Sequence, residues 1–314
     1  AMPARVHILD DHVVNQIAAG EVVERPASVV KELVENAIDA GADEITVVIA
    51  GGGRSSIEVI DNGCGMSRED ALLALQRFGT SKISSVNDLL GISTHGFRGE
   101  ALPSIASVSR FVLSTAQSDG CGTEVEVEGG NLRNVAARSM SAGTRVQVRD
   151  IFINVPARRK FLRAEATETG MIKMLITDFA AAYPKLRLRL VADGKEVVLY
   201  APAPSFTERI KQLRFGQGQP VIFEDELRIN DNLLQLAGAV SQPVDCVADS
   251  SRLRLLVNNR SVRDKLLLRA VRDGYGNFLK SGRYPQGVLK LNLAVADVDV
   301  NVHPQKIEVR FRDP

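Results

Sequence analysis

The sequence predicts two α+β domains, and three observations lead to this fold class. The chain has 314 residues, about twice the length of an average domain. Helical and strand patterns occur in both halves, but without the regular β-α-β alternation of a doubly wound sheet. The segment Ala201–Phe206 (APAPSF) interrupts these patterns with two prolines. We therefore expect one domain over residues 1–204 and a smaller α/β domain over residues 205–314.

The first domain is predicted from capping residues and apolar periodicity. Pro26 suits a first helical position, and an apolar period runs from there to Ala40, before Gly41. Ser67 and Asp70 form a capping pair at the start of another helix. Further helices are predicted over residues 100–108 and 164–183, and strands over residues 45–50, 57–61, 110–116, 123–127, 144–152, 186–192 and 196–201. Residues 79–99 are rich in Gly, Ser and Thr, which is typical of a functional lid or of a disordered linker.

The second domain follows the proline-containing segment. Here the patterns predict a helix, three strands that end at Val262, a helix over residues 264–279, and strands over residues 287–295 and 306–311.

The composition excludes several classes of protein. Hydrophobic residues make up 45% and charged residues 25% of the chain, so wholesale disorder is excluded. No apolar run approaches the ~18 residues that cross a bilayer, and no secretory signal is recognisable. Cys64, Cys121 and Cys246 are odd in number and far apart, which disfavours a disulfide framework and a zinc site. We expect a cytoplasmic protein.

Charge is distributed unevenly between the two predicted domains. The net charge is +1 overall, −3 over residues 1–204 and +4 over residues 205–314. A mild basic excess in the second domain is compatible with a polyanionic partner. The chain has no Trp and four Tyr, so a binding surface built on base stacking is not expected.

The helix over residues 27–40 carries a candidate catalytic pair. At 100° per residue, Glu32 and Asn36 project together from the margin of an apolar arc, whereas Glu35 falls on the solvated side with Lys31 and Asp39. A carboxylate and an amide in this arrangement can serve as a general base and a metal ligand. The alternative for this pair is an ordinary solvated helix flank. The apolar arc consists of Val29, Val30, Leu33, Val34, Ala37 and Ile38.

Three glycine-containing motifs follow along the chain. Asp61 ends a strand, where its carboxylate can accept a hydrogen bond from an adenine amino group, and Gly63 and Gly65 allow close backbone approach. The glycines at residues 96–99 lead into a helix N-terminus, which suits phosphate oxygens. Gly143 and Thr144 precede a later strand. Taken alone, each motif also fits an ordinary turn or helix start.

The order of these motifs resembles the ATPase superfamily of gyrase B subunits, the ninety-kilodalton heat-shock chaperone, histidine kinases and MutL (the GHKL superfamily). Longer strings are similar to the MutL family of DNA mismatch-repair ATPases, and they extend over nearly the whole chain. They are NQIAAGEVVERP (15–26), KELVENAIDAGA (31–42), TSKI (80–83), GFRGEAL (96–102), PARRKFL (156–162) and NVHPxKxEVRF (301–311).

This resemblance implies a fold and a set of roles. The fold would be a GHKL-type α/β sandwich, a mixed sheet with helices on one face, followed by a transducer-like domain. Glu32 would polarise the attacking water, Asn36 would bind Mg²⁺, and Lys306 would reach the γ-phosphate of ATP from the second domain. Asp61 would read adenine, with Gly63, Gly65 and Thr144 around the base. Thr80, Ser81 and Lys82 would lie in the lid, and Gly96, Phe97, Arg98, Gly99, Glu100, Ala101 and Leu102 would cradle the triphosphate.

The resemblance also implies partners. ATP would order the lid (79–99), and the arm over residues 5–20 would contribute to a homodimer. Taken alone, the apolar residues of this arm also suit packing on its own domain. A mismatch-recognition protein and downstream nuclease or helicase factors would bind, and no endonuclease is expected in residues 1–314. DNA would bind non-specifically through its phosphates. The candidate DNA-binding residues are Arg158, Arg159, Lys160, Arg260, Arg263, Lys265 and Arg269, although Arg158 and Arg159 also suit a structural role at a strand–helix junction.

Two other functions are compatible with parts of the pattern. A kinase of the same superfamily needs a phosphoacceptor histidine on a dimerising helix, and none of His7, His12, His95 and His303 is so placed. A DNA-binding module with a decayed nucleotide site is disfavoured, because every residue type that the hydrolysis requires is present.

Overall fold

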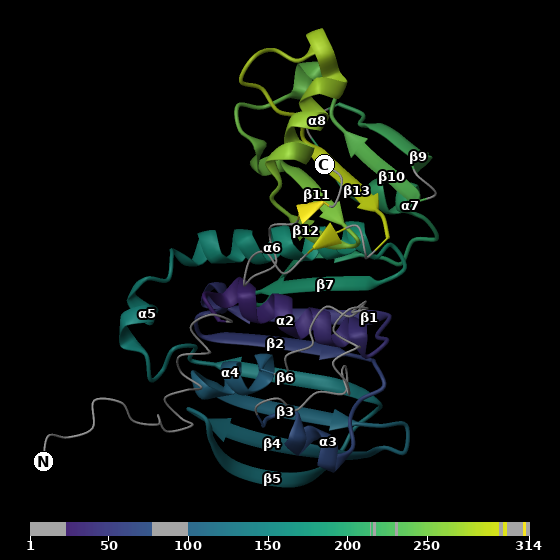
Figure 1. Ribbon diagram of the computed structural model, residues 1–314. Coiled ribbons are helices and arrows are strands. Elements are labelled where there is room, and N and C mark those ends of the chain that lie inside the picture. Colours follow the sequence, from purple (N-terminus) through teal and green to yellow (C-terminus); the bar gives the residue numbers. More distant parts are fainter. Residues whose placement is uncertain are drawn as a thin grey trace, which may run out of the picture. The chain divides into compact units, whose positions relative to one another are not determined.

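The computed structural model (Figure 1) describes residues 23–76, 100–213, 215, 218–229, 232–294, 298–299 and 310–311. The N-terminal arm and the predicted lid lie outside this part of the chain, as do the site residues Thr80, Ser81, Lys82, Gly96, Phe97, Arg98, Gly99 and Lys306. The chain divides into two compact units. One comprises Ala1–Leu175 and Leu188–Leu199, and the other comprises Ile176–Arg187 and Tyr200–Pro314. The predicted boundary after residue 204 stays a prediction.

The larger sheet has eight strands in the order β5-β4-β3-β6-β2-β1-β7-β8. Its strands are β1 (Glu44–Ala50), β2 (Ser56–Asp61), β3 (Arg110–Ala116), β4 (Cys121–Glu128), β5 (Asn131–Ser139), β6 (Gly143–Arg149), β7 (Arg187–Ala192) and β8 (Lys195–Tyr200). The accompanying helices are α2 (Pro26–Asp39), η1 (Gly51–Gly53), α3 (Arg68–Leu73), α4 (Ala101–Ser107), α5 (Pro156–Lys160) and α6 (Glu165–Ala182). Pro26 opens α2, and Ser67 caps α3 through the amide of Asp70, both as predicted.

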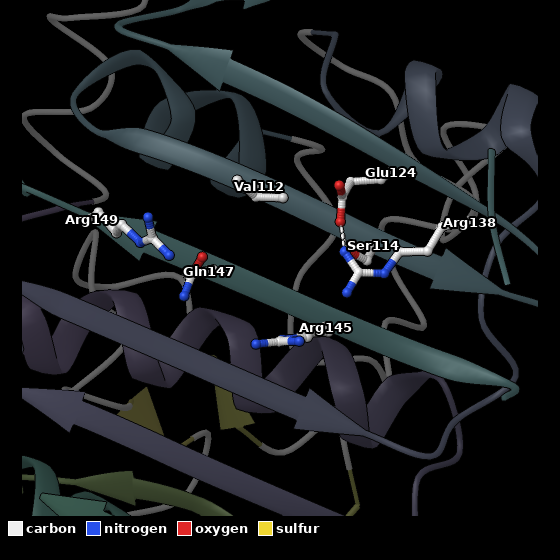
Figure 2. Close-up of a pocket in the computed structure, with 7 residues that line it drawn as sticks. All are labelled: Val112, Ser114, Glu124, Arg138, Arg145, Gln147 and Arg149. Carbon is white, nitrogen blue, oxygen red and sulfur yellow. Dashed lines mark hydrogen bonds and ion pairs between the residues drawn. The ribbon is translucent and has the colours of Figure 1, made fainter. Parts of the chain in front are cut away.

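The two faces of this sheet differ in polarity because side chains alternate along each strand. Val59, Val146 and Leu113 are neighbours across β2, β6 and β3 and are buried on the face where α2 and α4 pack. The other face carries a hollow of about 130 Å³, shown in Figure 2. It is lined by Val112, Ser114, Glu124, Arg138, Arg145, Gln147 and Arg149. Cross-strand ion pairs join Arg138 to Glu124 and Arg145 to Glu58, so this face is a polar ladder.

The second unit is built on a five-stranded sheet of order β12-β11-β13-β10-β9. Its elements are α7 (Phe206–Ile210), β9 (Val221–Ile229), β10 (Asn232–Val240), η3 (Pro243–Asp245), η4 (Ser250–Arg252), β11 (Leu253–Val257), β12 (Arg260–Val262), α8 (Lys265–Tyr275), η5 (Gly276–Phe278) and β13 (Gly287–Asn292). A short pair, β14 (Val298–Asp299) and β15 (Arg310–Phe311), is antiparallel. Leu267 and Val271 of α8 pack on the core formed by Leu255, Val257 and their neighbours.

Several expected boundaries were wrong. Strand β5 was not predicted, and four strands (β9 to β12), not three, precede residue 263. The helix expected over residues 264–279 ends at Tyr275, and β6 stops at Arg149 because Asp150 and Phe152 adopt φ values of 52° and 63°, which no strand accommodates. Within the described residues, no helix has the length and apolar character needed to span a bilayer.

Candidate functional site

A row of polar side chains lies across one end of three central strands, β2, β6 and β3, on the face that the helices cover. Strand register places Asp61 opposite Thr144, and Thr144 opposite Thr115. The Thr115 hydroxyl is fully buried; it lies 3.0 Å from the Thr144 hydroxyl and 3.1 Å from the carbonyl oxygen of Gly143. It also accepts a hydrogen bond from the Met66 amide at 2.9 Å. We call Asp61, Thr144 and Thr115 the polar shelf. The pairing of the three strands fixes the relative positions of these residues.

The turn after β2 is attached to the loop that joins α2 and β1. The Asn62 side-chain oxygen accepts hydrogen bonds from the amides of Asp43 and Glu44 at 3.1 and 3.0 Å. The Cys64 amide donates to the carbonyl of Ala40, directly after α2, at 3.0 Å. These contacts hold Asp61 close to the C-terminal end of α2.

Two positions of this turn, 63 and 65, require glycine because neighbouring atoms leave no room for a Cβ atom. Gly65 has a φ of +65°, and a Cβ there would lie 1.8 Å from the carbonyl oxygen of Ala116. A Cβ on Gly63 would lie 2.9 Å from the Cβ of Ala40. Close backbone packing of β2, β3 and α2 thus explains the D-x-G-x-G spacing without reference to a ligand.

Asp61 is the titratable group of the shelf. Burial raises the pKa of its carboxyl above the ordinary value of 3.8, while hydrogen bonds from the amides of Gly63, at 2.8 Å, and Thr144 lower it. A carboxylate has about four acceptor positions. With two taken by amides, Asp61 can still accept a hydrogen bond from an amino group.

The helix α2 presents Glu32 and Asn36 one turn apart, both half-buried. With a rise of 1.5 Å per residue, Asn36 lies about 6 Å and Glu32 about 12 Å along the axis from Ala40, where the Asp61 turn is attached. The three polar groups therefore follow one another along α2, in the order Asp61, Asn36, Glu32.

The prediction for Glu35 was wrong. It is 7% exposed, not solvated, and its carboxylate pairs with Lys31 at 3.2 Å. The helix is enclosed on more than its predicted apolar arc, and the ion pair offsets the cost of burying this charge.

The chemistry of Asn36 fits a magnesium ion. In nucleotide sites Mg²⁺ takes one or two protein oxygens and completes its shell with phosphate oxygens and water. The side-chain oxygen of Asn36 is a hard ligand of this kind, half-buried beside Glu32. A site that also contains a triphosphate needs no larger set of protein ligands.

The remaining described site residues lie at the start of α4. Ala101 and Leu102 form its first turn, and Glu100 precedes it with its carbonyl bonded to the Ser104 amide at 3.0 Å. All three are half-buried. The other residues of the predicted phosphate cradle lie outside the described residues.

The candidate DNA-binding residues form one group in each unit. In α5, Arg159 and Lys160 are exposed, whereas Arg158 is half-buried, with its guanidinium 3.4 Å from the Val23 carbonyl and 5.9 Å from the centre of the Phe152 ring. Arg158 thus has structural contacts. In the second unit, Arg263, Lys265 and Arg269 are exposed and Arg260 is half-buried. Arg269 pairs with Asp273 at 3.6 Å.

Sequence reasoning missed two residues that organise the site. Neither Asn62 nor Thr115 is among the predicted site residues. The available signal for Thr115 was its polar side chain at a position where strand alternation predicts a buried residue, in phase with Phe111 and Leu113.

Comparisons with known proteins identify the family of this chain. Residues 24–142 match the family model described as histidine kinase-, DNA gyrase B-, and HSP90-like ATPase, and residues 222–314 match the one described as DNA mismatch repair protein, C-terminal domain. The solved ATPase domain of Aquifex aeolicus MutL complexed with ADP is 30% identical with a TM-score of 0.64, over 87% of this chain and 93% of that one. The chain belongs to the MutL family.

Other MutL proteins support the assignment. DNA mismatch repair protein MutL of Geobacter sulfurreducens is 47% identical over 312 residues, which are 99% of this chain and 51% of the relative. The chain thus spans about half the length of the MutL relatives it matches. A solved N-terminal domain of a DNA repair protein is 25% identical with a TM-score of 0.80, over 96% of this chain and 92% of that one. The predicted GHKL fold is confirmed, and the chain contains a MutL-type ATPase domain.

Proposed function

We propose that this chain binds ATP along α2, hydrolyses it with Mg²⁺, and uses the nucleotide state to control dimerisation during DNA mismatch repair. One observation carries the proposal: Glu32 and Asn36 lie about 6 Å apart along the axis of α2, and the turn that carries Asp61 is attached at Ala40, about 6 Å beyond Asn36. An extended nucleotide presents its base, its metal-bound phosphates and its terminal phosphate in the same order.

In this arrangement each side chain has one task. Asp61 accepts the adenine amino group, with Gly63, Gly65 and Thr144 shaping the space around the base. Glu32 takes a proton from the attacking water, whose oxygen forms the new bond to the γ-phosphorus as the bond to the ADP oxygen breaks. Such a general base contributes about 10²–10⁴ in rate. Asn36 would hold Mg²⁺, which when bound offsets the phosphate charge.

The remaining site residues complete the proposal by family resemblance. Thr80, Ser81 and Lys82 would contact ribose and phosphates, residues 96–102 would enclose the triphosphate, and Lys306 would contact the γ-phosphate. A residue that senses the γ-phosphate makes different contacts with ATP and ADP, so hydrolysis can shift a conformational equilibrium.

We extend the proposal to partners on the same basis. ATP would order the lid and favour a homodimer, DNA would bind through phosphate contacts at the two basic groups, and a mismatch-recognition protein and downstream nuclease or helicase factors would bind the ATP state. The cytoplasmic location and the absence of endonuclease activity from residues 1–314 stay predictions.

The test is Glu32→Gln, which preserves size and helix propensity but removes the basic carboxylate. We expect steady-state ATP hydrolysis to fall at least about a hundredfold, while the Kd for a fluorescent ATP analogue changes less than about threefold. Glu196→Gln is the matched control, because Glu196 is an exposed carboxylate of β8 paired with Arg189 at 2.8 Å. Retained turnover in Glu32→Gln would remove Glu32 from the catalytic role.

A further inference from the structure

Phe161 is an exposed aromatic residue directly after the basic helix α5. It is 85% exposed, although a phenylalanine ordinarily buries 150–250 Å² on folding. Arg159 and Lys160 precede it and Arg163 follows it, and all three are exposed. Within the part of the chain that the structure describes, no carboxylate pairs with these three cations. An aromatic ring and unpaired positive charge therefore share one short surface segment, residues 159–163.

The backbone of this segment is fixed on both sides of the ring. The Phe161 amide donates to the carbonyl of Arg158 at 3.0 Å, and the Arg158 guanidinium is itself held by Val23 and Phe152. On the other side, the Arg163 amide donates to the carboxylate of Glu168 at 3.1 Å, and Glu168 is 1% exposed. Phe161 is thus exposed on a segment whose backbone is anchored at both ends. Ordering this segment on ligand binding would therefore cost little conformational entropy.

The chemistry of the segment selects its ligand. Three unpaired cations attract a polyanion, and an exposed aromatic face binds a flat ring. A nucleic acid with unpaired bases offers both groups at adjacent positions, since each nucleotide carries one phosphate and one base. A duplex offers the phosphates but keeps its bases stacked on one another.

We propose that Phe161 is a base-stacking residue, which holds an unpaired base of DNA while Arg159, Lys160 and Arg163 contact the flanking phosphates. This inference rests on the proposed DNA binding and adds the kind of DNA that α5 selects. It also revises the sequence-based expectation about stacking, because a single aromatic side chain is sufficient for one base.

The first experiment compares Phe161→Ala with Phe278→Ala, whose side chain is 81% exposed in η5. We expect Phe161→Ala to lower the affinity for an oligo-dT strand about tenfold to a hundredfold. The salt dependence should stay unchanged, since the phosphate contacts remain. Affinity for a duplex should change less than twofold, and Phe161→Tyr should retain single-strand binding. Equal single-strand affinity of Phe161→Ala and Phe278→Ala would overturn the proposal.

The second experiment uses the absence of tryptophan from the chain. Phe161→Trp and Phe278→Trp each introduce one fluorophore, and stacking on a base quenches indole emission. We expect oligo-dT to quench the tryptophan at position 161 and to leave that at position 278 unchanged. Suppose instead that phosphatidylglycerol vesicles enhance the emission at position 161 and oligo-dT does not quench it. The segment would then be assigned to a membrane surface, and the proposal would be overturned.

The assays also separate this inference from the proposed function. A wild-type protein that hydrolyses ATP but binds neither oligo-dT nor duplex would overturn the DNA proposal and this inference together, and would leave the ATPase proposal intact. A protein that binds both DNA forms equally well with and without the Phe161 ring would overturn the inference alone.

Discussion

At the scale of single residues, neighbouring strands hold Asp61 and Gly65 in environments that few other residues would tolerate. Asp61 keeps a carboxylate half-buried because two amides donate to it, and Gly65 occupies a space that any Cβ would overlap. Both conditions come from neighbouring strands and not from the turn itself. Substitution of Asp61 therefore tests ligand binding, and substitution of Gly65 tests packing.

Asp61→Asn is expected to weaken ATP binding about tenfold to a hundredfold, because a charge-assisted acceptor becomes a neutral one. The fold should tolerate the change, since Asn can still accept from the Gly63 amide. Isothermal titration with a non-hydrolysable ATP analogue measures the affinity. Asp225→Asn, on exposed strand β9, is the matched control; unchanged affinity in Asp61→Asn would exclude adenine recognition by this carboxyl.

The same variant gives a pH dependence with a defined sign. Burial raises the pKa of Asp61 in the folded state above 3.8, so the folded protein binds this proton more readily than the unfolded chain. Its contribution to stability is then largest below pH 3.8 and is lost as pH rises through the folded-state pKa. Asp61→Asn should thus be at least as stable as wild type at neutral pH, with an advantage that shrinks as the solution is acidified. Thermal unfolding at several pH values measures this, and an advantage that grows with acidification would contradict it.

A glycine pair tests the steric requirement of the turn. Gly65→Ala should destabilise the protein by several kcal/mol, because its Cβ would lie 1.8 Å from a backbone oxygen. Gly120→Ala has a similar φ of +74° but no atom within 4 Å, so only the cost of the left-handed conformation, about 1 kcal/mol, remains. Chemical unfolding compares the two, and equal losses would show that packing around Gly65 is not the cause.

At the scale of elements, capping fixes where a helix begins and therefore where its charged residues lie. Asp264 caps α8 by accepting from the Leu267 amide at 2.8 Å, while Leu267 and Val271 attach the helix to the sheet. The exposed Lys265 therefore stands at a fixed position at the start of α8. By contrast, Arg254 is turned toward Asp178, at 3.3 Å, and is less available to a ligand.

Lys265→Glu is expected to lower DNA affinity and to reduce the slope of log K against log salt by about one, as the loss of one phosphate contact requires. Lys195→Glu, at an exposed position of β8, makes the same charge change at a residue outside both basic groups. Filter binding between low and moderate salt supplies both slopes. An unaltered slope in Lys265→Glu would move the DNA contact away from α8.

At the scale of the whole molecule, each of the two sheets positions a different set of residues. The eight-stranded sheet provides the shelf for Asp61 and Thr144 at one edge, and the five-stranded sheet provides the platform for α8. The chain spans about half the length of the MutL relatives that it matches.

Sizing chromatography tests the proposed switch. With a non-hydrolysable ATP analogue and Mg²⁺, we expect a shift from monomer to dimer; with ADP, or in Asp61→Asn at the same analogue concentration, we expect the monomer. The reason is that only the γ-phosphate state would order the proposed lid and arm. A monomer under all conditions, in a protein that still hydrolyses ATP, would make this chain a simple hydrolase.

The sequence by itself determined the fold class, the first helix and most strands of the first unit, since these follow from local periodicity and capping. It also singled out Glu32, Asn36 and Asp61 as candidate site residues, because residue types and their spacing can be recognised along the chain; their roles stay predictions. It did not predict β5, whose residues are mostly exposed and show little alternation. Tertiary structure alone decided that Glu35 is buried, that Thr115 supports the shelf and that Asp61 lies beside the end of α2. These depend on contacts between residues distant in the chain, which no local pattern encodes.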